Sequence, residues 1–104
     1  MAGLSQAARR IEQDEAAGGS SNRLVTCADG HQATASIALR PPPGRKGYKV
    51  YAYLRWLEHG TSKTRERYVC SMPPVDRNRM LAQAWSQAKD RGLLTPEGQP
   101  PIGS

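Results

Sequence analysis

The sequence predicts a small α+β fold in which an antiparallel β-sheet packs against a C-terminal helix. Residues 48–57 are rich in aromatic and branched side chains, which is typical of a strand, and residues 62–70 return as its partner after His59-Gly60. Residues 76–91 carry apolar side chains at helical spacing. Because a lone hairpin is only marginally stable, we expect this helix to cover the apolar face of the sheet.

The length of 104 residues fits one domain with short appendages. We expect an N-terminal helix and flexible joint at 1–22, a sheet-plus-helix binding domain at 23–94 and a disordered tail at 95–104. The tail is rich in Pro and Gly, which disfavour regular structure.

The first expected helix, at 4–17, has a thin apolar stripe. Its members follow one another at i, i+3, i+4 and i+7: Leu4, Ala7, Ala8 and Ile11. Gly18 is a suitable end for this helix. Because the stripe is thin, this helix needs a partner surface, and a homodimer formed through it is one alternative.

The segment between this helix and the hairpin is ambiguous. Residues 24–28 suit a short strand, Asp29-Gly30 signals a turn, and residues 33–39 alternate as a third strand would. The alanines at 33–39 suit a helix as well, so the third strand stays an open alternative. The run at 41–44, Pro-Pro-Pro-Gly, then breaks any regular element.

The C-terminal helix has the clearest boundaries. Asp76 is a suitable N-cap, Gly92 is a suitable residue to close the helix, and Leu93 is placed to fold back on the last turn. Its apolar face consists of Leu81, Ala84, Trp85 and Ala88.

The net charge of +6 is concentrated in one segment. Nine basic and three acidic residues lie between Arg45 and Arg79, whereas the six basic and six acidic residues elsewhere cancel. Such a local excess indicates a surface that meets an anionic partner, although a solvated charged surface is the plain alternative.

The length of the hairpin turn decides which side chains share a face. A two-residue turn at His59-Gly60 would mix cations with Leu54 and Trp56, which is costly if that face is buried. We therefore predict a three-residue turn, His59-Gly60-Thr61. One face is then basic and aromatic and consists of Lys49, Tyr51, Tyr53, Arg55, Lys63, Arg65, Arg67 and Val69.

We predict that this basic face binds duplex DNA. A two-stranded ribbon fits the major groove, where Arg pairs with guanine and Lys contacts phosphates. Flanking phosphate contacts are expected from Arg45, Lys46, Arg77 and Arg79. The plain alternative is a charged edge strand that resists aggregation.

A resemblance supports the same function. The residues that carry it are Tyr51, Tyr53, Leu54, Arg55, Trp56, Lys63, Arg65, Arg67 and Tyr68. Followed by a helix, they resemble the three-stranded-sheet-plus-helix DNA-binding modules of plant AP2 domains and of the N-termini of tyrosine recombinases. They also resemble hairpins of small proteins and transposase N-termini on mobile elements. The resemblance covers about residues 33–91 and implies that the sheet enters the major groove. It departs at the Ala-rich first strand and the triple proline.

The resemblance implies a stand-alone regulator or accessory factor, with a mobile element as one setting, because no recombinase catalytic domain follows. The alternative function is a small protein-interaction module or inhibitor that engages an acidic patch on a partner. RNA binding is a weaker option because no RNA-recognition consensus is present.

No residue pattern points to catalysis, so we expect no enzyme, no cofactor and no small-molecule substrate. The four zinc-type ligands, Cys27, His31, His59 and Cys70, have spacings that match no common metal site, and the two cysteines are expected to be free. The chain has no apolar run of transmembrane length and no signal pattern, which predicts a cytoplasmic protein away from membranes.

Overall fold

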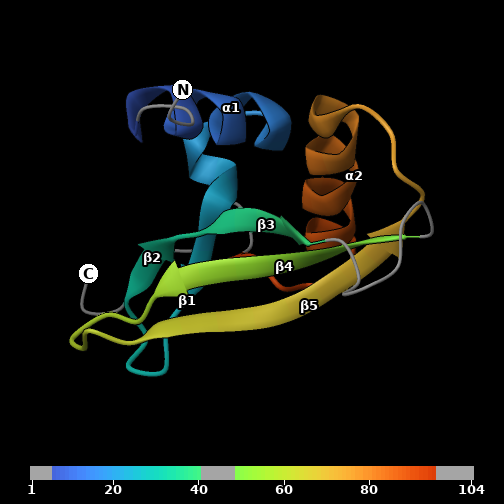
Figure 1. Ribbon diagram of the computed structural model, residues 1–104. Coiled ribbons are helices and arrows are strands. Elements are labelled where there is room, and N and C mark those ends of the chain that lie inside the picture. Colours follow the sequence, from blue (N-terminus) through green and yellow to red (C-terminus); the bar gives the residue numbers. More distant parts are fainter. Residues whose placement is uncertain (1–5, 41–48, 96–104) are drawn as a thin grey trace.

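The computed structural model describes residues 6–40 and 49–95 and confirms the α+β class. A two-stranded antiparallel sheet and a three-stranded antiparallel sheet combine with two α-helices (Figure 1). The three-stranded sheet has the order β3-β4-β5. The elements in chain order are α1 (Gln6–Ala17), the 3-10 helix η1 (Ser20–Arg23), β1 (Leu24–Thr26), β2 (Gln32–Thr34), β3 (Ser36–Arg40), β4 (Val50–Leu57), β5 (Thr64–Met72) and α2 (Arg77–Asp90).

The predicted strand at 33–39 is divided between the two sheets. Its first part belongs to β2, which pairs with β1, and its second part is β3, which pairs with β4. Ala35 lies at the division and is fully buried. Its N–H donates to the Arg23 carbonyl at 2.7 Å, and its carbonyl accepts from Arg23 Nε at 2.9 Å. A small residue is needed here because the chain changes sheets inside the core.

The C-terminal helix has the predicted buried face and C-terminus. Its four apolar residues are buried and pack in one cluster with Ala52 and Leu54 of β4. Gly92 adopts a left-handed conformation with φ 72°, and the Leu93 N–H donates to the Ala88 carbonyl at 3.0 Å, as a helix-closing glycine requires. Asp76 occupies the N-cap position, but its side chain makes no capping hydrogen bond.

The apolar stripe predicted for α1 is wrong in the part that the structure describes. Ile11 is 56 % exposed, and the buried anchor of the helix is Gln13. Gln13 Nε2 donates to the Ile37 carbonyl at 3.1 Å, and its Oε1 accepts from the Ile37 N–H at 3.0 Å. Trp85 Nε1 also donates to Oε1, at 3.1 Å. A polar residue is favoured here because the edge strand β3 presents unpaired backbone groups to the helix.

Several predictions lie outside the described residues. They concern Leu4, the triple-proline run, the loop cations Arg45 and Lys46, and most of the tail at 95–104. Among the described residues, no helix has the length and apolar character that crossing a membrane requires.

Candidate functional site

The β4–β5 hairpin ends in a four-residue turn, so the predicted three-residue turn is wrong. Glu58 N–H donates to the Lys63 carbonyl at 3.0 Å, which leaves His59–Ser62 between them. Gly60 has φ 79°, and Thr61 stabilises the longer turn because its hydroxyl donates to the Glu58 carbonyl at 3.1 Å and accepts from Lys63 N–H at 3.1 Å. Trp56 consequently pairs with Arg65 and Leu54 pairs with Arg67.

A β-bulge divides the hairpin into a covered half and an open half. Tyr53 pairs with Tyr68, the next pair is Ala52 with Cys70, and Val69 is the extra residue on β5. Val69 and Met72 are buried, whereas every residue from Thr64 to Tyr68 is exposed. The bulge therefore lets one strand combine an exposed polar half with a buried apolar half.

The open half of β5 carries two cations, Arg65 and Arg67, on the face that also bears Leu54 and Trp56, and Lys63 directly precedes the strand. We call Lys63, Arg65 and Arg67 the basic stripe. All three are exposed, and none forms an ion pair with a residue in the ranges 6–40 and 49–95. The cost expected for mixing cations with apolar side chains does not arise, because the stripe lies on an exposed part of an edge strand.

The opposite face of the sheet holds three of the predicted site residues, Tyr51, Tyr53 and Arg55. We call this surface the tyrosine face, and its other members are Arg40, Glu66 and Tyr68. The rings of Tyr53 and Tyr68 meet edge to face with centroids 5.8 Å apart, and the Arg40 guanidinium lies 4.9 Å from the Tyr53 ring centre. The predicted single basic face is therefore two surfaces.

The charges of the tyrosine face are partly neutralised. Arg40 donates two hydrogen bonds to the Glu66 carboxylate, at 2.9 and 2.5 Å, and Arg55 Nε lies 2.8 Å from the same group. The Arg40 hydrogen bonds, with the charges of both arginines, hold the pKa of Glu66 below its ordinary value of 4.5. Two cations thus share one anion here, in contrast to the basic stripe.

The remaining predicted cations are dispersed. Lys49 is exposed just before β4. Arg77 donates to the Glu12 carboxylate of α1 at 2.9 and 3.1 Å, and Arg79 lies 3.7 Å from Asp76. Arg77 therefore joins the two helices and is not a free cation at the hairpin.

A cleft of about 890 Å³ lies between α1 and the open end of the sheet. Arginines dominate its lining: Arg9, Arg10, Arg23, Arg55 and Arg77. Arg23 is buried and donates hydrogen bonds to the Asp14 carboxylate at 2.7 Å, to the Ala35 carbonyl and to the Ser36 hydroxyl. Arg9 and Arg10 are exposed, and no described residue forms an ion pair with either. Sequence analysis missed this pair because the acids of the same segment cancel its charge.

Three metal-type ligands that are far apart in the sequence lie close together. Ligand atoms of Asp29, His31 and His59 all lie within 4.8 Å of one another, and all three residues are exposed. Hydrogen bonds from His59 and from the His31 backbone lower the pKa of Asp29 from 3.8 to about 2. Cys70 lies in β5 outside this group, and both cysteines are free. Burial raises the pKa of the Cys70 thiol.

Comparison of the chain with protein-family models, with curated proteins and with solved structures found no match.

Proposed function

We propose that the protein binds duplex DNA through the basic stripe Lys63, Arg65 and Arg67. The observation that carries this proposal is that three exposed cations alternate along the start of one edge strand and the residue before it, without an ion-pair partner among the described residues. A cation that is already paired must give up its partner before it meets a phosphate, whereas an unpaired one exchanges only water and counterions.

The dimensions of the stripe suit a DNA groove. Alternate residues of a strand are on the order of 7 Å apart, so three of them extend over about 13 Å. The major groove is about 12 Å wide and admits a two-stranded ribbon. Arg65, Arg67 and Lys63 are then in reach of the phosphates that line the groove, and each of them contacts phosphate as an unpaired cation.

The cleft beside the hairpin supports the proposal with a second set of cations. Arg9 and Arg10 line it from α1, and Trp56 and Thr64 line it from the hairpin, whereas the basic stripe lies outside its lining. Positive charge in a concave surface concentrates anions more effectively than the same charge on a flat one. We therefore assign these two arginines to phosphates that flank the hairpin.

Two matched double variants of the full-length chain test the proposal. Arg65→Gln/Arg67→Gln removes two charges from the stripe, and Arg40→Gln/Arg55→Gln removes two charges from the tyrosine face. Fluorescence anisotropy with a labelled 20-base-pair duplex is measured at a series of salt concentrations. For the stripe variant, the slope of log K against log salt falls in magnitude by about 1.8, because each lost phosphate contact removes about 0.9. The tyrosine-face variant keeps the wild-type slope.

Three results would contradict the proposal. Equal changes in both variants would mean that overall charge, and not the stripe, controls binding. Tighter binding to single strands or to RNA would redirect the assignment to another nucleic acid. Absence of duplex binding by the wild-type chain at about 50 mM salt, together with stoichiometric capture of one acidic protein, would favour the protein-interaction alternative.

A further inference from the structure

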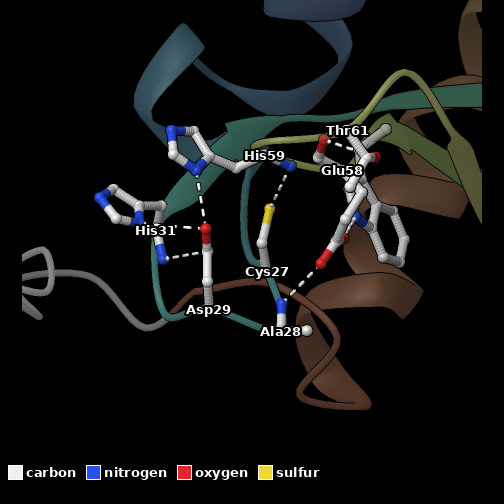
Figure 2. Close-up of polar contacts among 8 residues, drawn as sticks. Cys27, Ala28, Asp29, His31, Glu58, His59 and Thr61 are labelled. Carbon is white, nitrogen blue, oxygen red and sulfur yellow. Dashed lines mark hydrogen bonds and ion pairs between the residues drawn. The ribbon is translucent and has the colours of Figure 1, made fainter.

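Two turns from different sheets meet at one end of the molecule. The first joins β1 to β2 over Cys27–His31, where Cys27 N–H donates to the His31 carbonyl at 2.7 Å and Gly30 has φ 89°. The second is the hairpin turn that begins after Glu58. Figure 2 shows the side chains of the two turns facing one another.

The contact between the turns is fixed through Glu58. This carboxylate is buried and accepts from Ala28 N–H at 2.7 Å and from Trp56 Nε1 at 2.9 Å. These hydrogen bonds hold the pKa of Glu58 below its ordinary value, and the bond from Ala28 has the largest effect. His59 N–H also lies 3.5 Å from the buried Cys27 Sγ. The Glu58 and Cys27 contacts therefore hold the two turns together in addition to the contacts that Asp29 makes.

This arrangement brings three ligand atoms within 4.8 Å of one another. Asp29 Oδ2 lies 2.7 Å from His59 Nδ1 and 3.3 Å from His31 Nδ1. The other carboxylate oxygen, Oδ1, is occupied by His31 N–H at 3.0 Å. The two imidazole rings are stacked with centroids 4.0 Å apart and an interplanar angle of 15° (Figure 2).

We propose that Asp29, His31 and His59 bind a Zn²⁺ ion that joins the two turns. In a tetrahedral zinc site with bonds of about 2.0–2.2 Å, neighbouring ligand atoms are on the order of 3.4 Å apart. The observed Oδ2–Nδ1 distances of 2.7 and 3.3 Å are close to this spacing, and zinc binding requires the stacked imidazole rings to rotate until both Nδ1 lone pairs point to the ion. Three protein ligands of the nitrogen and oxygen type leave the fourth position for water.

The contact between His59 and Asp29 has a consequence for the position of a proton. A hydrogen bond from His59 Nδ1 to the Asp29 carboxylate requires a proton on Nδ1, whereas zinc needs the lone pair of each Nδ1. On binding, each neutral imidazole carries its proton on Nε2. Of the two ring nitrogens, this is the one that does not face Asp29. This inference concerns a different part of the hairpin from the basic stripe and does not depend on DNA binding.

Titration of the chelator-treated full-length chain with ZnCl₂ by isothermal calorimetry tests the site. One equivalent binds to the wild type, and His31→Ala, His59→Ala and Asp29→Asn each weaken the affinity at least about tenfold. Glu66→Gln and Cys70→Ser serve as matched controls, because they remove a carboxylate and a thiol elsewhere, and they keep the wild-type affinity. Melting of each metal-free variant shows that it folds.

Two further readouts keep the proposal falsifiable. Zn²⁺ raises the Tm of the wild type and not that of His59→Ala, because the ligands converge only in the folded chain. Co²⁺ substituted at the site gives visible absorption bands that His59→Ala abolishes. The proposal is overturned if the wild type binds no zinc, or if both His variants retain full affinity while a cysteine variant loses it. Since no DNA is present, these results are separate from the DNA titrations.

Discussion

The two edges of the three-stranded sheet are treated in opposite ways. At the β3 edge, Gln13 of α1 occupies the Ile37 backbone N–H and carbonyl as a neighbouring strand would. At the β5 edge, the residues from Lys63 to Tyr68 are exposed and carry the basic stripe. One edge is closed by a buried amide, and the other is left open with charge on it.

We expect the two edges to have different roles, the β3 edge in stability and the β5 edge in function. An unpaired sheet edge is a template for association with other chains, and natural proteins cover it or charge it. The covered edge connects α1, β3 and α2 through a single side chain, so we expect it to matter for folding. The charged edge leaves three cations available to a partner, so we expect it to matter for binding.

Gln13→Leu should have the largest effect on stability. It leaves the Ile37 N–H, the Ile37 carbonyl and the Trp85 indole without partners, and each buried unsatisfied group costs about 1–3 kcal/mol. We expect a loss of about 3 kcal/mol or more in the free energy of unfolding, measured by urea denaturation. Gln83→Leu, at an exposed position of α2, is the control and should cost under about 0.5 kcal/mol. Equal losses would show that the β3 edge does not depend on this amide.

Arg91→Ala should have an intermediate effect at the other edge. Arg91 Nη1 donates to the Tyr68 carbonyl at 3.0 Å and to the Val69 carbonyl at the bulge. Because Arg91 is exposed, we expect a loss of about 1 kcal/mol in the free energy of unfolding. The salt dependence of DNA binding should stay unchanged. A loss as large as that of Gln13→Leu would mean that both edges are equally structural.

Arg65→Val/Arg67→Val tests what protects the open edge. Both residues are exposed, so the free energy of unfolding should change by under about 0.5 kcal/mol per site. Removal of charge from an edge strand should promote self-association, which light scattering measures as a function of protein concentration. If this variant stays as monodisperse as the wild type, the cations do not protect the edge, and their role in binding is the stronger explanation for them.

Glu66→Gln should have the smallest effect, and the effect should depend on pH. The folded-state pKa of Glu66 lies below 4.5, so its contribution is present above pH 4.5 and is lost as the pH falls through the lower folded value. The wild type should therefore melt slightly above the variant at neutral pH, and the difference should vanish in strong acid. High salt should reduce it. A difference that grows on acidification would contradict this assignment of charge.

The same variant sharpens the functional comparison. Glu66→Gln releases Arg40 and Arg55 from their shared partner without touching the basic stripe. The salt dependence of DNA binding should stay within experimental error of the wild type. An increase of about two in the slope would mean that the tyrosine face, and not the stripe, meets the phosphates.

Local sequence patterns were sufficient to predict those features that depend only on neighbouring residues. The apolar spacing of α2 and its closing Gly92 were predictable, as were the strong strand at 48–57 and the Asp29-Gly30 turn, because each depends on neighbouring residues. The turn length, the bulge at Val69 and the amide anchor Gln13 were not predictable in this way. The turn length depends on the hydrogen bond from Thr61 to the Glu58 carbonyl. The bulge lies where β5 changes from buried to exposed, and Gln13 is needed because the edge of β3 is unpaired.

The sequence by itself determined the fold class, the buried face of α2 and the presence of a basic hairpin, since periodicity and composition are local properties of the chain. Tertiary structure alone decided which cations are free and which are paired. A four-residue turn moved Lys63, Arg65 and Arg67 to the face opposite Tyr51 and Tyr53, because a change in register exchanges the faces of a strand. It also decided that two turns from separate sheets would bring His31 and His59 together at Asp29, since residues 28 positions apart meet only through the packing of those sheets.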